Sequence, residues 1–269
     1  MALRAPFNIA HAEIGAAAHL SVRRKQLLRR PRFDLATVLV VLDGRKILAG
    51  AGQPVEAGRG GVVLVPPGTE TDVVNVPGPA GIYRAILICF AGSLLAAFSQ
   101  GHPRLVAGRR PLGQPSVLAD PIDFVEAVRR AVLGLAGETS AGPELLRHRL
   151  VEVLVMLAER GIVFDGLRPL RLAERVGAHM ARDLAHAWTA GEVSRDLGLS
   201  EPTLRRRLAE EGTSFSRVLA DARLGRALFL LQSSEEDVTR IALDVGYRSA
   251  SRFAARFRQR YGLPPSQAR

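Results

Sequence analysis

The sequence predicts an α+β multidomain protein with a β-rich N-terminal part, a pair of helices and an all-α C-terminal part. Three observations support this fold class. Strand-like apolar runs separated by turn residues fill residues 33–90. Apolar residues at helical spacing follow between about 120 and 160. Two copies of an apolar helix, a Gly turn, a Ser and a short basic helix then occupy residues 189–212 and 237–262, which is the pattern of a helix-turn-helix.

The β-rich part contains the runs LATVLVVL, GGVVLVPPG and GIYRAILICF. Gly, Pro, Asn and Asp separate these runs, as is typical of antiparallel strands joined by short turns. Gly58, Gly60 and Gly61 precede a strand, so they fit a turn and not a phosphate-binding loop. Strands of this kind form a sandwich or a barrel. The interior of a barrel is the natural pocket for a small-molecule effector.

Two helices are expected after the strands, at Asp120 to Leu135 and at Pro143 to Glu159. The apolar stripe of the second helix consists of Leu146, Leu150, Val153 and Leu157. This stripe suits an antiparallel helix pair or a dimer seam, and it equally suits packing against the chain's own barrel, since both have the same period.

A linker is expected over residues 161–171, because Gly166 and Pro169 break helical continuity. The expected domains are therefore 1–165, with its barrel at about 33–90 and its helices at about 120–160, and 166–269.

The first helix-turn-helix copy has clear boundary signals. Thr189 and Glu192 form a T-x-x-E capping box that opens the first helix. Ser200 is a good N-cap for the basic helix, and Pro202 falls in its first turn, where backbone N–H groups lack helical partners. Residues 214–231 then read as one helix that holds the two copies at a fixed separation.

The second copy repeats these signals. Asp237 and Ser249 are expected to cap its two helices, and Gly262 ends the basic helix before Pro264 and Pro265. Corresponding i,i+4 apolar pairs in the basic helices are expected to pack inward: Leu204 with Leu208, and Phe253 with Phe257.

Several segments from about Pro169 to Arg269 occur in a fixed order: Trp188, LGLSEPTLRRRL, EEGTSF, Arg223 with Leu224 and Ala227, IALDVGY and SRFAARFRQRYGLPP. In this order they resemble the DNA-binding domain of the AraC/XylS family of bacterial transcription regulators. The run TLRRRLAEEGTSF is similar to the GadX-like and Rns-like branch. The resemblance implies two recognition helices in successive major grooves, joined by a rigid helix. The run AGRGGVVLVPPGTETDVVN resembles the cupin-like sensory domain of the same family.

The resemblance also implies which positions contact DNA. Base-reading positions of the first basic helix match Pro202, Arg205 and Arg206, and a guanidinium there can bond bidentately to guanine. The matching positions of the second helix are Ala250, Ser251, Ala254 and Ala255. Because these residues are small, we expect the second helix mainly to grip phosphates through its arginines, Arg252, Arg256, Arg258 and Arg260. The alternative is that these arginines form only a solvated face.

The complete set of expected DNA-binding residues is Ser200, Pro202, Thr203, Arg205 and Arg206 in the first copy and Ser249, Ala250, Ser251, Arg252 and Arg256 in the second.

Composition agrees with an anionic partner. The net charge is +11, and all but two of the 37 basic residues are arginine. The single cysteine, Cys89, rules out an internal disulfide and suits the cytoplasm; it is expected to be a buried small residue. No apolar run is long enough to span a membrane.

No metal, cofactor or catalytic pattern is found in the sequence. The His-x-His pair of metal-binding cupins is missing after Gly68, where Glu70 and Asp72 are read as turn residues or as acceptors for an effector. We therefore expect a cytoplasmic regulator that is not an enzyme. Its expected partners are promoter DNA, RNA polymerase as the family implies, a small-molecule effector whose site residues are unknown, and a second copy of the chain. The family's usual mode is activation.

Two alternatives remain open at this point. In the first, the protein binds DNA without an effector and uses its barrel only for dimerisation. In the second, a cupin-type enzyme is fused to a DNA-binding tail, which the missing metal ligands disfavour.

Overall fold

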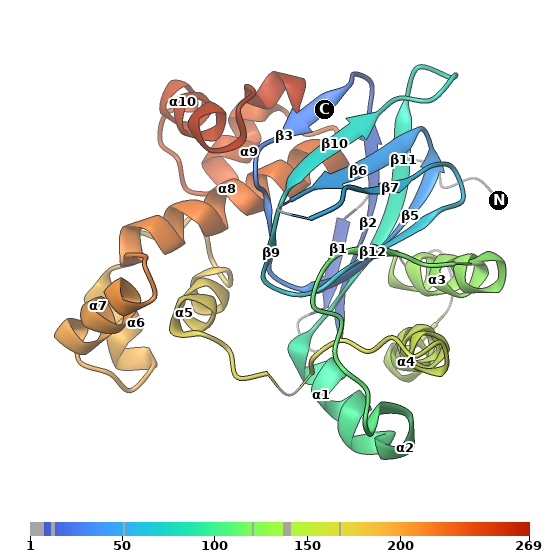
Figure 1. The fold of residues 1–269 in the computed structure, drawn as a ribbon. Coiled ribbons are helices and arrows are strands. Elements are labelled where there is room, and N and C mark those ends of the chain that lie inside the picture. Colours follow the sequence, from blue (N-terminus) through green and yellow to red (C-terminus); the bar gives the residue numbers. More distant parts are fainter. Residues whose placement is uncertain (1–7, 12–13, 51, 120, 137–140, 167) are drawn as a thin grey trace. The chain divides into compact units, whose positions relative to one another are not determined.

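The computed structural model describes residues 8–11, 14–50, 52–119, 121–136, 141–166 and 168–269. The chain divides into two compact units (Figure 1). The first comprises Met1–Arg168, Gln232–Glu235 and Gln267–Arg269, and the second comprises Pro169–Leu231 and Glu236–Ser266.

The first unit is built on antiparallel sheets. Its strands are β1 (Asn8–His11), β2 (Gly15–Val22), β3 (Gln26–Leu28), β4 (Arg32–Phe33), β5 (Ala36–Asp43), β6 (Arg45–Ala49), β7 (Val55–Ala57), β8 (Val62–Val65), β9 (Thr69–Glu70), β10 (Asp72–Val76), β11 (Tyr83–Phe90) and β12 (Ser116–Val117). One six-stranded sheet has the order β1-β2-β11-β5-β8-β12, a four-stranded sheet has the order β3-β10-β6-β7, and β4 pairs with β9. The three predicted runs form β5, β8 and β11.

The β-rich character of this unit is confirmed, but the expected closed barrel is not. Within the described residues, the hydrogen-bonded ladders end at β1 and β12 in one sheet and at β3 and β7 in the other. The chain passes from the small sheet into the large one at residues 58–61, where the Gly61 N–H donates to the Gly58 carbonyl. β7 and β8 are consecutive in the chain but belong to different sheets, so no ladder joins them. Gly60 has φ +81°, as a turn glycine would.

The helices of the first unit are α1 (Gly92–Gly101), α2 (Pro103–Val106), α3 (Ile122–Leu135) and α4 (Pro143–Glu159). In Figure 1, α3 and α4 lie side by side next to the six-stranded sheet, and α3 contacts β2 and β11. Asp120, the expected start of the first helix, lies outside the described residues.

The apolar stripe of α4 is buried in the same core as the large sheet. Leu146, Leu150, Val153 and Leu157 all belong to the cluster that contains Phe90 and Phe124. The structure shows the helix pair, because α4 packs against α3, and the stripe lies in the core of its own unit.

The second unit is all-α, as predicted. Its elements are α5 (Leu172–Met180), α6 (Ala190–Asp196), α7 (Glu201–Glu210), α8 (Phe215–Ser233), α9 (Val238–Asp244), α10 (Ala250–Tyr261) and the 3-10 helix η1 (Pro265–Gln267). The last two residues of α8 and the end of η1 group with the first unit. α6 and α7 lie beside the start of α8, while α9 and α10 lie beside its later turns (Figure 1). None of the helices in the described part of the chain is both long and apolar enough to cross a membrane.

Candidate nucleic-acid interface

The first helix-turn-helix consists of α6 and α7, and its boundaries follow the sequence signals. The Thr189 side chain accepts the Glu192 N–H at 3.2 Å, and the Glu192 carboxylate accepts the Thr189 N–H at 2.8 Å, which completes the capping box. The Thr189 hydroxyl, together with its N–H, holds the pKa of Glu192 below its ordinary value. Gly198 turns the chain at φ +67°. The Ser200 Oγ then accepts the Thr203 N–H at 3.3 Å and begins α7.

Buried residues hold α7 with one face outward. Leu204 and Leu208 have no exposed surface and pack in a cluster with Val193 of α6 and Phe215 of α8. Because the apolar pair faces inward, Pro202, Arg205 and Arg206 are exposed together on another side. The structure therefore brings the expected base-reading residues of the first copy onto one accessible surface, with exposed Ser200 and half-buried Thr203 at its start.

The arginines of that surface are paired within the helix. Arg205 donates to the Glu201 Oε1 from Nε at 2.8 Å and from a terminal nitrogen at 2.6 Å. A terminal nitrogen of Arg206 lies 2.5 Å from the Glu210 Oε1. All four side chains are more than 40% exposed, so both ion pairs lie in water.

The second helix-turn-helix consists of α9 and α10. The Asp237 side chain accepts the Thr239 N–H at 2.7 Å and caps α9. Gly246 turns the chain at φ +87°, and a Cβ there would lie 2.4 Å from the Leu184 carbonyl oxygen. The Ser249 Oγ accepts the Arg252 N–H at 3.3 Å and caps α10. This copy thus repeats the cap, turn and cap of the first.

An aromatic row anchors α10. Phe253, Phe257 and Tyr261 are buried, and their successive ring centroids lie 5.6 and 4.8 Å apart. The expected DNA-binding residues of this copy are all exposed: Ser249, Ala250, Ser251, Arg252 and Arg256. Ala255 is exposed as well, and Ala254 is half-buried. Arg260 faces α8 instead and donates to the Asp221 carboxylate at 3.0 Å.

Two positioning residues carry no local sequence signal for their roles. Glu211, just after α7, accepts the N–H groups of Leu172 and Ala173 at 2.8 and 3.0 Å, so it caps α5 from 39 residues away. Arg223 of α8 donates to the carbonyl oxygens of Leu184 and His186 at 3.0 and 2.9 Å. Desolvation lowers the pKa of the Arg223 guanidinium. The bonds of Glu211 tie the end of α7 to the start of α5, and those of Arg223 tie α8 to the segment between α5 and α6.

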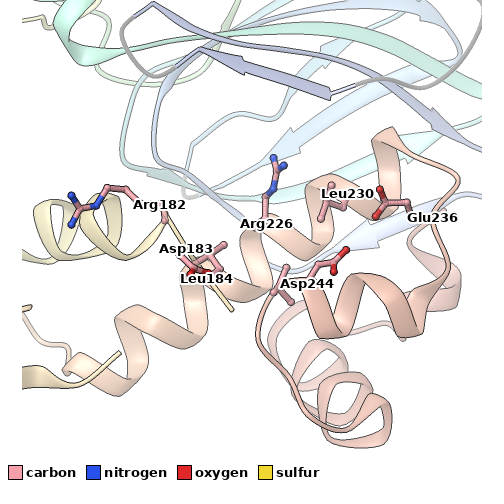
Figure 2. Close-up of a pocket in the computed structure, with 9 residues that line it drawn as sticks. Arg182, Asp183, Leu184, Arg226, Leu230, Glu236 and Asp244 are labelled. Carbon is pink, nitrogen blue, oxygen red and sulfur yellow. The ribbon is translucent and has the colours of Figure 1, made fainter. Parts of the chain in front are cut away.

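A pocket of about 320 Å³ opens in the second unit (Figure 2). Its labelled side chains come from the segment after α5, from α8, from the segment between α8 and α9, and from α9. They include the cations Arg182 and Arg226 and the carboxylates of Asp183, Glu236 and Asp244. None of its lining residues belongs to α7 or α10, so it is separate from the two exposed helix faces.

In the first unit, a groove of about 500 Å³ is lined by the β5–β6 turn at Gly44, the turn after β10 at Gly78, and Arg59. Glu70 and Asp72, read as turn residues or effector contacts, both bond to Arg30, at 3.2 and 2.8 Å. Burial raises the pKa of the Cys89 thiol to about 11. Within the residues that the structure describes, no three His, Cys, Asp or Glu side chains are grouped as metal ligands would be.

The sequence of the second unit is similar to that of known proteins. Residues 193–269 match a family model described as "Helix-turn-helix domain". The "HTH-type transcriptional regulator GadX" of Escherichia coli O6:H1 is 34% identical over 106 residues, which is 39% of this chain and 38% of that protein. The "DNA-binding dual transcriptional regulator Rns" of Escherichia coli is 33% identical over 95 residues, which is 35% of this chain and 36% of that protein. The chain thus spans little more than a third of the length of these relatives.

The whole fold also has solved counterparts. The structure of ToxT from Vibrio cholerae superposes with a TM-score of 0.66 at 12% identity and covers 94% of this chain and 97% of that one. This likeness shows a shared two-domain fold with a β-rich N-terminal part and a helical C-terminal part. The sequence matches and the two capped helix-turn-helix copies show that the second unit contains a helix-turn-helix domain, and this unit is similar in sequence to regulators of the AraC/XylS family such as GadX and Rns.

Proposed function

We propose that this protein is a sequence-specific DNA-binding transcription regulator that reads two adjacent major-groove segments of one duplex. One observation carries the proposal. α7 and α10 are both N-capped and anchored by buried side chains, and each leaves an arginine-bearing face exposed. Helix-turn-helix units that contact one duplex face lie about one helical turn, ~34 Å, apart, and both copies here are attached to the same helix, α8.

The two helices are proposed to divide the work. Arg205 and Arg206 of α7 are long donors suited to the O6 and N7 acceptors of guanine. The exposed positions of α10 near its N-terminus are Ala250, Ser251 and Ala255, which reach less far, while Arg252 and Arg256 suit phosphate contacts. α7 therefore supplies base choice, and α10 supplies affinity and register.

The remaining partners are part of the same proposal. We infer a cytoplasmic activator that contacts RNA polymerase and receives a small-molecule effector through its β-rich unit. ToxT of Vibrio cholerae has been solved with an unsaturated fatty acid bound, which supports a small-molecule effector for a protein of this two-domain fold. A second copy is also a proposed partner, through a surface other than the α4 stripe, because that stripe is buried.

Genomic fragment capture tests the DNA-binding function. The purified full chain is incubated with sheared genomic DNA at near-physiological salt, and the bound fragments are sequenced. A recurring motif that covers two adjacent major-groove segments is the expected result. Capture without a motif that is lost steeply as salt rises would mean phosphate-driven binding alone and would contradict sequence-specific regulation.

Thermal shift tests the effector role separately. A metabolite that binds only the folded β-rich unit raises the melting temperature, and the increase grows with the logarithm of its concentration once the site is saturated. If no metabolite pool shifts the melting temperature while the motif is still bound, the protein is an effector-independent regulator.

A further inference from the structure

Two of the three exposed arginines of α7, Arg205 and Arg206, are already paired with carboxylates of the same helix. Arg205 is held by Glu201, one turn before it, and Arg206 by Glu210, one turn after it, at 2.6 and 2.5 Å. A DNA contact through the nitrogens that are already paired therefore requires that this ion pair opens first. The two carboxylates compete with the DNA for the guanidinium groups.

The second recognition helix is built differently. α10 contains no Asp or Glu between Ala250 and Tyr261. Its Arg256 bonds to a neutral partner, the Gln259 amide oxygen, at 3.3 Å. Among the described residues, Arg260 is the one arginine of this helix that pairs with a carboxylate, and that carboxylate belongs to α8. The arginines that suit phosphate contacts thus meet no acidic competitor from their own helix.

Glu210 occupies a position that helix stability does not favour. It lies in the last turn of α7, where the partial negative charge of the helix end repels a carboxylate. Pairing with Arg206 offsets part of that repulsion. The position of Glu210 is therefore better explained by its pairing with Arg206 than by a contribution to the stability of α7.

We propose that Glu201 and Glu210 are specificity-determining residues that hold Arg205 and Arg206 away from phosphates at non-cognate DNA. An exposed ion pair within a helix is weak, and a single screened phosphate contact is similarly weak, so the pair persists on random sequence. Two simultaneous bonds to guanine O6 and N7 are stronger and open the pair at the cognate base. The carboxylates also repel nearby phosphates. This inference rests on the proposed DNA-binding function.

A double-mutant cycle tests this proposal in the full chain. Dissociation constants are measured over a series of salt concentrations for two duplexes of equal length and composition, one with the captured motif and one scrambled. The variants are Glu201→Gln, Arg205→Ala and both together. Glu210→Gln with Arg206→Ala repeats the cycle at the other end of α7. Glu159→Gln, at an exposed position in α4 of the other unit, is the control for the same change in net charge.

The expected result is a loss of discrimination without a loss of binding. Glu201→Gln tightens binding to the scrambled duplex about threefold beyond the Glu159→Gln control, as the loss of a weak competing pair predicts. It also steepens the salt dependence on that duplex. The slope of the logarithm of the binding constant against the logarithm of the salt concentration changes by up to ~0.9, because one more arginine contacts a phosphate. The motif duplex changes less, and the effect disappears in the Arg205→Ala background.

Three results would overturn the inference. The first is an equal tightening by Glu159→Gln, the second is an effect of Glu201→Gln that survives Arg205→Ala, and the third is weaker binding to both duplexes. Melting temperatures of all variants verify that they are folded. If the wild-type protein does not prefer the motif duplex, the proposed function itself fails, and the inference fails with it.

Discussion

Asp221 of α8 and Arg260 of α10 form an ion pair at 3.0 Å, although 39 positions separate them in the sequence. The pair is partly shielded, with the Arg260 side chain 21% exposed and that of Asp221 39% exposed. It links α8 to α10 and thereby contributes to the orientation of α10 within its unit.

Replacing Asp221 by Asn should therefore lower the free energy of unfolding by about 1 kcal/mol or less, as partly exposed pairs do. Urea unfolding with Arg260→Gln and the double variant isolates the coupling between the two side chains. Asp244→Asn is the matched control, because Asp244 pairs with Arg240 four residues away in the same helix. A coupling no larger than that of the control pair would show that Asp221 does not fix α10.

Base reading and phosphate contact should separate in two arginine variants. Arg206→Ala is expected to cost about 1–3 kcal/mol on the cognate duplex and to relax base choice at one position. Arg256→Ala should weaken cognate and random duplexes alike and reduce the salt slope by about 1. Binding titrations on a panel of single-base variants of the motif measure both effects. Identical profiles for the two variants would contradict the division of labour between α7 and α10.

The two turn glycines should respond differently to alanine. Gly198 and Gly246 both have positive φ, at +67° and +87°. A Cβ at Gly198 meets nothing within 4 Å, whereas one at Gly246 lies 2.4 Å from the Leu184 carbonyl oxygen. Gly198→Ala should cost about 1–2 kcal/mol from backbone strain alone, and Gly246→Ala should cost more because of the added clash. Equal losses in urea unfolding would show that the backbone at Gly246 relaxes freely.

A buried lysine predicts the pH dependence of stability. Lys46 of β6 is only 4% exposed, and its Nζ donates to the Asn75 Oδ1 at 3.0 Å and lies 5.8 Å from the centroid of the Tyr83 ring. Burial lowers the pKa of Lys46 from 10.5 to about 7. Between these values the unfolded chain holds the proton and the folded chain releases it, so stability rises with pH over that window.

Lys46→Met should remove this rise. The variant gains most over the wild-type protein at and below pH 7, where the folded protein must bury a charge, and the gain shrinks as the pH approaches 10. The change in slope is at most about 1.4 kcal/mol per pH unit. Lys25→Met is the matched control, because Lys25 is the other lysine of the chain and is exposed. Parallel stability curves for the wild-type protein and Lys46→Met would contradict the lowered pKa.

Local signals made the C-terminal unit readable from sequence. The Thr189 capping box, the Ser200 and Ser249 caps and the Gly246 turn each act within a few residues, and the structure shows each of them. The helix expected at 214–231 is α8, Phe215–Ser233. The pairing of Arg205 with Glu201 also follows from i,i+4 spacing. The Glu211 cap on α5 does not, because its partners are 38 and 39 residues away.

The first unit was less predictable because its decisive contacts are not local. β2, GAAAHLSV, lies before residue 33, where the predicted barrel began. It is buried on both faces of the sheet along most of its length, so its sequence lacks the apolar alternation that marks a half-exposed strand. Closure of a barrel depends on which strand edges meet, and no pattern within one strand encodes that. The partner against which the apolar stripe of α4 packs likewise depends on the tertiary fold, and the period of the stripe does not identify it.

Hydroxyl-radical footprinting of the full chain on its captured motif tests the central claim most directly. A reader with two helices on one duplex face predicts two protected segments about one helical turn, ~10 bp, apart on each strand. Arg206→Ala should weaken the protection at one segment first. A single protected segment, with α10 contributing none, would contradict the account of two recognition helices on adjacent grooves.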